Sequence, residues 1–160
     1  MSLHHFDAAD ASRFLNPSVF YVGASYGGCE CQLVRFIQEG IWENGYIKCP
    51  QPTSTTDLYE QYMDTMTKGD VLLVKRLNGK ASTTMRIMAI GIVLGKNIDK
   101  TIRVAWVMPQ VDLVVPLITV GTVSPSYSLS QSINDPVRDK IEKARIKFLR
   151  LNLRIEDRKY

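Results

Sequence analysis

The chain has 160 residues, of which 45% are hydrophobic and 22% charged, and its formal net charge is +4. A chain of this length forms about one domain and buries a core of its own, so the composition excludes a disordered segment and a scaffold that depends on crosslinks. No apolar stretch approaches the ~20 residues of a membrane span and no signal peptide is visible, so we expect a soluble, cytoplasmic protein.

The first third of the chain predicts a lead-in, a strand and a helix. Residues 1–18 are polar, and Val19–Ala24 (VFYVGA) is apolar and aromatic, which predicts a buried strand. Ser25–Glu30 is a loop in which two adjacent glycines let backbone amides approach a partner closely. Residues 31–41 predict a short helix, and a turn follows at Trp42–Gly45.

The middle of the chain predicts mainly strands. After a Pro/Thr-rich loop and a helix at Asp57–Met66, four segments of strand length follow, at Val71–Lys75, Ile87–Leu94, Ile102–Met108 and Leu113–Thr119. Asn78-Gly79 predicts a hairpin turn, and Gly91 inside a strand predicts a bulge or a close backbone approach. Five or six short strands with few helices predict an α+β fold with a partly closed β-barrel, whereas a doubly wound fold needs a helix between most strands.

The C-terminal segment has its own composition. Residues 136–160 carry nine basic and four acidic residues, a net charge of +5, whereas residues 1–135 carry eleven and twelve, a net charge of −1. Asp135 predicts an N-cap, with Pro136 at the first helical position. Apolar residues then recur at heptad-type spacing, at Val137, Ile141, Ala144, Phe148, Leu151 and Ile155. The sequence leaves four roles open for this helix. It could pack on the barrel, connect to a further domain, pair with itself or contact phosphates.

Several motifs follow one another in an order that resembles a known family. They are VGASYGG and GIWENGY within Phe20–Tyr46, GD at the start of a strand, AIGIV, and the VxW strand that ends at Trp106. From residue 19 to about 117 this succession resembles the N-terminal domains of McrB-like restriction GTPases, which belong to the EVE branch of the PUA-like superfamily and are similar to YTH domains. The resemblance implies a PUA-like barrel at residues 19–133, between the lead-in and the helix at 134–160.

The resemblance also implies a function and a site. Domains of this kind accept a modified base, often one flipped out of a duplex, and serve as targeting modules of restriction or defence systems. The YTH pattern carries over to Ser25 and Tyr26 in the loop after the first strand and to Trp42 as a wall of the aromatic cage, while Trp106 should be a core residue. The second cage aromatic of YTH domains lies in the connection before the VxW strand, and here that connection is GKNIDKT, without an aromatic.

The residue types support the same interpretation of the site. An indole at Trp42, in a turn between two glycines, offers a face on which a base stacks with ~1–3 kcal/mol. The alternative is that Trp42 covers the core of the barrel. Glu30 and Gln32 are further candidates for contacts with a base edge, and Asn44 serves either the base or its own turn.

Basic residues around the predicted hairpin are candidates for phosphate contacts. They are Lys75, Arg76, Lys80 and Arg86. Such side chains straddle a phosphate backbone in a complex and are simply solvated in its absence.

Catalytic motifs are missing from the sequence. It has no phosphate-binding Walker loop, its two histidines lie at positions 4 and 5, and no paired acidic cluster with a lysine suggests a nuclease centre. Three cysteines, at positions 29, 31 and 49, indicate free thiols rather than a disulfide framework or a zinc site. We therefore expect a binding module without metal or cofactor that targets DNA more readily than RNA, joined to a nuclease or GTPase partner or domain. The alternative is an assembly module that self-associates through residues 136–155.

Overall fold

The computed structural model describes residues 14–26, 30–45, 55–79, 81–118, 121–129 and 135–157. The predicted lead-in before residue 14, most of the loop at 48–56 and the side chain of Lys80 lie outside these ranges. Within them, no helix is long and apolar enough to cross a membrane.

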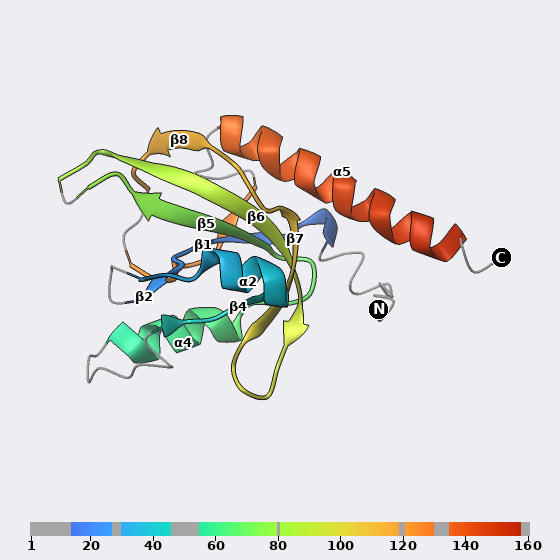
Figure 1. Ribbon diagram of the computed structural model, residues 1–160, viewed down its shortest axis with the longest axis horizontal. Helices are drawn as coiled ribbons and strands as arrows, with labels where there is room; N and C mark the ends of the chain where they lie inside the picture. The colour runs from blue at the N-terminus through green and yellow to red at the C-terminus, as the bar shows by residue number, and fades with distance from the viewer. Residues whose placement is uncertain are drawn as a thin grey trace.

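A mixed sheet of seven strands forms the centre of the described structure (Figure 1). Its path runs β4-β7-β6-β5-β1-β9, and β8 pairs with β6 beside β7. The strands are β1 (Ser18–Val22), β4 (Ile41–Trp42), β5 (Val71–Leu77), β6 (Thr84–Lys96), β7 (Ile102–Met108), β8 (Leu113–Pro116) and β9 (Tyr127–Ser128). A separate pair joins β2 (Ser25–Tyr26) to β3 (Glu30–Cys31).

The α+β class is confirmed, but the expected partly closed barrel is wrong, because the sheet does not close. Closure requires the two outermost strands to pair with each other. Here these strands are β4 and β9, which have two residues each and lie at opposite ends of the path. The short apolar segments of the sequence predicted the strands, but they do not show whether the two outermost strands of the sheet pair with each other.

Helices cover both faces of the sheet and make two hydrophobic cores. On one face α5 (Asp135–Asp157) packs against the sheet, and on the other face lie α2 (Leu33–Glu39) and α4 (Thr55–Asp64) (Figure 1). Side chains from Val19 to Val22 alternate between the two cores, so this part of β1 is buried on both faces of the sheet. It runs parallel to β5, because α2, β4 and α4 carry the chain back across the sheet between them.

The long strand β6 bends enough to pair with two successive strands along one edge, β8 near its start and β7 near its end. Gly91 lies at a register shift between β6 and β7. A side chain at this position would overlap Val104 and meet the Trp106 ring at 2.8 Å. The predicted close approach at Gly91 is therefore confirmed.

Candidate functional site

Trp42 lies in strand β4, not in the predicted turn. Gly40 ends helix α2 in the left-handed conformation, with φ 65°, and its carbonyl accepts a hydrogen bond of 2.9 Å from Val104 N. The chain is thereby held against β7, and Trp42 pairs with Ile102. Glycine is the residue that adopts this conformation without strain, so the Gly40–Trp42 spacing fixes where the indole enters the core.

The Trp42 indole is completely buried, with 0% of its surface exposed. Its Nε1 donates a hydrogen bond of 2.8 Å to the carbonyl oxygen of Gly23, which follows β1. The bond joins Trp42 to Gly23, within the predicted strand segment Val19–Ala24 and before the predicted loop at Ser25–Glu30. The indole fills this space, and no face of it is open for stacking. The prediction of an exposed indole face at Trp42 is therefore wrong. The alternative, that Trp42 covers the core, describes the structure.

The other predicted base contacts lie around this junction. Ser25 is exposed in β2, and the Gln32 Oε1 atom accepts a hydrogen bond of 2.9 Å from Arg35 Nε. Asn44 is buried beside Met63, with 3.5 Å from its Nδ2 to the Met63 sulfur. The side chains of Tyr26 and Glu30 lie outside the described residues.

Among the predicted phosphate contacts that the structure describes, Arg76 and Arg86 lie opposite each other on β5 and β6, whereas Lys75 is buried. Arg76 is exposed, and Arg86 forms an ion pair of 3.4 Å with Asp112. Lys75 is only 7% exposed, and burial lowers its pKa from 10.5 to about 8. This lysine follows a bulge between β5 and β6 that turns it into the sheet, where the sequence pattern had placed it at a solvated hairpin.

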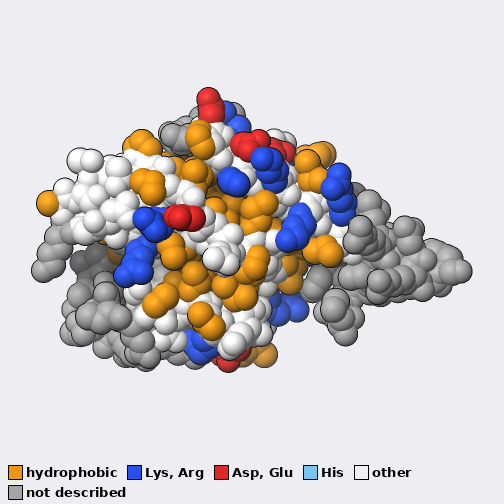
Figure 2. All heavy atoms as spheres, turned by 45° about the horizontal axis from the view of Figure 1, so that its top comes forward, with side chains coloured by type: hydrophobic (Ala, Val, Ile, Leu, Met, Phe, Trp, Pro, Cys, Tyr) orange, Lys and Arg blue, Asp and Glu red, His pale blue; other side chains and the backbone are white. Residues whose placement is uncertain are grey.

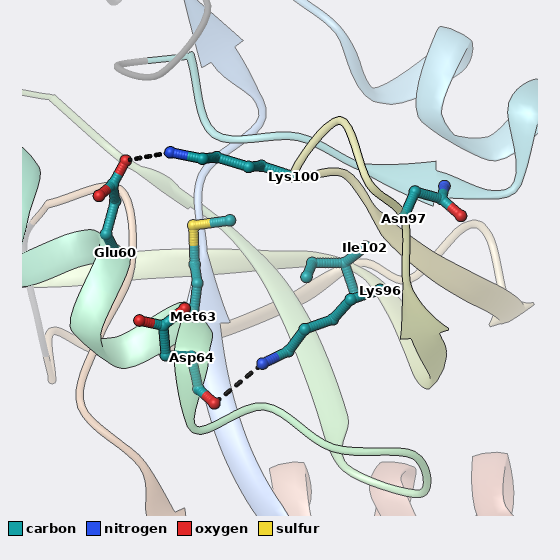
Figure 3. A pocket seen from close by; sticks show the side chains of 7 residues that line it. All are labelled: Glu60, Met63, Asp64, Lys96, Asn97, Lys100 and Ile102. Atoms are coloured by element: carbon teal, nitrogen blue, oxygen red, sulfur yellow. Dashed lines mark hydrogen bonds and ion pairs between the residues drawn. The ribbon is translucent and has the colours of Figure 1, made fainter.

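A pocket of about 250 Å³ lies between α4 and the turn that joins β6 to β7 (Figure 3). Its lining residues are Glu60, Met63, Asp64, Lys96, Asn97, Lys100 and Ile102. In Figure 3 the side chains of Met63 and Ile102 point toward each other between the two lysines. Met63 and Ile102 belong to the same hydrophobic cluster as Trp42. The apolar part of the pocket is therefore an edge of this cluster.

Two lysines reach from the turn across to α4 at either side of the apolar floor (Figure 3). Lys100 Nζ lies 3.1 Å from Glu60 Oε1, and Lys96 Nζ donates a hydrogen bond of 2.8 Å to the main-chain oxygen of Asp64. The Lys100–Glu60 pair is largely exposed, with 61% and 37% of the two side chains accessible. Exposed pairs contribute at most about 1 kcal/mol, so this bridge gives way readily to a ligand that binds either charge.

The turn that carries the lysines is held in one shape. Lys100 has φ 67°, and it is the only described residue other than glycine with a positive φ. Neighbouring hydrogen bonds fix this conformation: Thr101 N and Oγ1 both donate to Asp99, and Asn97 Nδ2 donates to Thr101 Oγ1 over 2.8 Å. Backbone strain of this kind costs of order 1 kcal/mol and persists where the surroundings impose it, commonly at binding sites.

The pocket combines a small apolar floor with carboxylates and ammonium groups at its rim, which suits a planar polar ligand. Among the described residues, no group of three His, Cys, Asp or Glu side chains could hold a metal ion. Sequence reasoning did not select the lining residues. The signal that could have found them is the connection GKNIDKT, where the resemblance expects a cage residue and where the structure places Lys96, Asn97 and Lys100.

Comparisons of the chain with protein-family models, with curated proteins and with solved structures found no match. The functional inference is therefore carried by the pocket and by the sequence motifs.

Replacement of Trp42 by alanine should destabilise the folded protein, because it leaves a cavity at a fully buried site and removes the N–H that donates to the Gly23 carbonyl. We expect the free energy of unfolding to fall by about 3–5 kcal/mol in urea titrations. Val34→Ala, at an exposed position of α2, is the control and should change it by less than about 0.5 kcal/mol. A Trp42→Ala protein of native stability would contradict the structural role of the indole.

Replacement of Lys75 by methionine should stabilise the protein at neutral pH, because burial penalises the charged lysine. Below pH 8 this lysine is protonated in the folded and unfolded states alike. Between pH 8 and 10.5 the folded protein loses the proton that the unfolded chain retains, so the stability of the unsubstituted protein rises with pH.

The advantage of Lys75→Met in urea unfolding should therefore shrink as the pH is raised from about 8 to about 10. The exposed Lys147→Met protein serves as the control for loss of a lysine elsewhere. Stability curves for the Lys75 variant and the unsubstituted protein that stay parallel across this range would contradict the lowered pKa.

Proposed function

We propose that the protein binds a nucleic-acid strand and holds a single extruded base in the pocket between α4 and the β6–β7 turn. The observation that carries the proposal is a pocket whose apolar floor, Met63 and Ile102, lies between Lys96 at the end of β6 and Lys100 in the turn that follows. The protein supplies recognition, and any cutting of the nucleic acid belongs to a partner or a fused domain.

The size of the pocket favours one ring system. Its volume of about 250 Å³ is below the ~300–1,000 Å³ of sites for drug-sized ligands. The Met63 thioether is flexible and polarisable, and sulfur contacts with an aromatic ring are favourable by about 0.3–1.5 kcal/mol. Met63 and Ile102 are 5% and 1% exposed, so a base that enters the pocket meets only the edge of this floor, and the charged side chains of the rim supply most of the contact.

The charges at the rim match the two ends of a nucleotide. The carboxylates of Glu60 and Asp64 accept hydrogen bonds from the amino groups of a base edge. Lys96 and Lys100 can exchange their contacts with α4 for phosphate oxygens, since both contacts are exposed to solvent and the Lys100–Glu60 ion pair is weak. Extrusion costs a few kcal/mol, which contacts of this number can offset.

The sequence motifs support the same substrate class. The resemblance to EVE and YTH domains implies recognition of a modified base, in DNA more readily than in RNA, and expects the connection before the VxW strand to contribute to the pocket. Here that connection supplies lysines instead of an aromatic residue. The proposed site therefore differs from an aromatic cage, and the modification that it accepts is set by the carboxylates.

The double variant Lys96→Met/Lys100→Met should weaken binding to a fluorescent oligonucleotide at least tenfold. The slope of log affinity against log salt should fall by about one to two, since each phosphate contact contributes about one. The double variant Lys140→Met/Lys147→Met removes the same charge from α5 and is the matched control, with affinity and slope little changed. Equal losses in the two variants would contradict the proposed site.

A panel of duplexes separates base reading from contact with the backbone alone. It contains methylated cytosine, hydroxymethylated cytosine, methylated adenine or no modification. Glu60→Gln removes a negative charge from the rim, so a site that contacts only phosphate would bind every duplex more tightly. A site that reads the base should instead lose its preference among the duplexes. An unsubstituted protein that binds no member of the panel would overturn the proposal.

A further inference from the structure

The turn between β6 and β7 carries a fully exposed isoleucine. Ile98 is the most exposed of the large hydrophobic side chains that the structure describes. It lies between Asn97 and Lys100, which both line the proposed base pocket, but it is not part of the lining itself. In Figure 1 the turn (yellow) projects from the lower side of the molecule. Ile98 is therefore at the tip of a projection beside the opening of the pocket.

Hydrogen bonds hold this tip in one conformation. Lys100 N donates to the Asn97 carbonyl over 3.1 Å, which closes a β-turn with Ile98 and Asp99 at its two central positions. Asn97 N donates to the Thr101 carbonyl over 2.9 Å, and the Asp99 carboxylate accepts from Thr101 N and Oγ1. Isoleucine is also stiff about its first side-chain torsion. An apolar side chain fixed in this way loses little conformational entropy when it enters another molecule.

The stability of the fold does not account for the isoleucine. Ile98 belongs to neither hydrophobic cluster, and polar residues, glycine or proline are the usual choices in a turn. Single exposed hydrophobic residues are common on protein surfaces. Ile98 differs from them in its position, because it lies on a rigid projection that also supplies residues to a pocket.

We infer, on the basis of the proposed base pocket, that the substrate is a duplex and that Ile98 enters its base stack as a wedge where the extruded base has left. Proteins insert aliphatic side chains of this kind between base steps. Extrusion of a base breaks its stacking on both sides and its pairing, at a cost of a few kcal/mol. Contacts of the wedge with the neighbouring bases offset part of this cost. A single strand has no paired stack to refill, so the wedge contributes little to its binding.

The charges beside the wedge match a duplex. Lys96 and Lys100 lie two positions before and two positions after Ile98, and both are exposed. A duplex has phosphates on both sides of every base step, so a wedge between two cations places each cation near a strand. Figure 2 shows the face that carries α5, where hydrophobic, basic and acidic side chains are mixed without a continuous basic field. That face offers no competing path for the phosphates.

Replacement of Ile98 by alanine in the full chain tests the wedge. Fluorescence anisotropy measures affinity for the duplex of the panel above that binds most tightly, and for its modified strand alone. Ile98→Ala should weaken binding of the duplex about tenfold and change binding of the single strand by less than about twofold, because only the duplex has a gap to fill. Ile98→Leu keeps an aliphatic side chain of the same size and should bind the duplex as the unsubstituted protein does.

Two controls separate the wedge from the pocket and from the fold. Val34→Ala removes an exposed aliphatic side chain from α2 and should leave both affinities unchanged. Thermal unfolding of Ile98→Ala should match that of the unsubstituted protein, since Ile98 packs in neither cluster. An Ile98→Ala protein that binds the duplex normally, or that loses both substrates equally, overturns the wedge and leaves the pocket standing. A Lys96→Met/Lys100→Met protein that binds both substrates normally overturns the pocket, and the wedge with it.

Discussion

The buried indole of Trp42 joins three segments that are distant in the sequence. Its N–H is bonded to Gly23 after β1, its backbone pairs with Ile102 at the start of β7, and its position follows from the left-handed Gly40 at the end of α2. Because the ring fills this junction completely, no ligand reaches its faces while the junction is intact. The space available to a ligand lies instead at the edge of this cluster, in the pocket between α4 and the β6–β7 turn.

This displacement changes how a base would be recognised. An aromatic cage binds through stacking, whereas the pocket here offers a thioether, an aliphatic side chain and four charged groups. The lysines pair with α4 in the absence of ligand, which keeps them near the pocket without a large energetic cost of release. Strain at Lys100 indicates that the turn is shaped by its hydrogen-bond network and not by the preference of its own residue.

Local patterns in the sequence predicted much of the fold. The apolar run of β7 was assigned with the same bounds, Ile102–Met108, and Gly91 was assigned a close contact, because strand length and a missing side chain are local properties. The open sheet was not predicted, since closure depends on the two-residue strands β4 and β9, which have no periodicity to read. Trp42 was placed in a turn because glycines on both sides of it, at positions 40 and 45, are typical of a loop. Only the pairing with β7 shows that Trp42 enters the core. The residues of the pocket come from α4 and from a polar turn, and each of them alone is typical of a solvated surface.

The most direct test of the base pocket is an NMR titration of protein labelled with ¹³C at its methionine methyl groups. A short oligonucleotide with the preferred modified base is added, and the Met63 methyl and the Trp42 indole N–H are followed together. Entry of a base over Met63 should shift its methyl signal upfield through the ring current and leave the Trp42 indole signal nearly unchanged. A shift of the indole signal with an unmoved Met63 methyl, or no shift of either on binding, would contradict this account of the site.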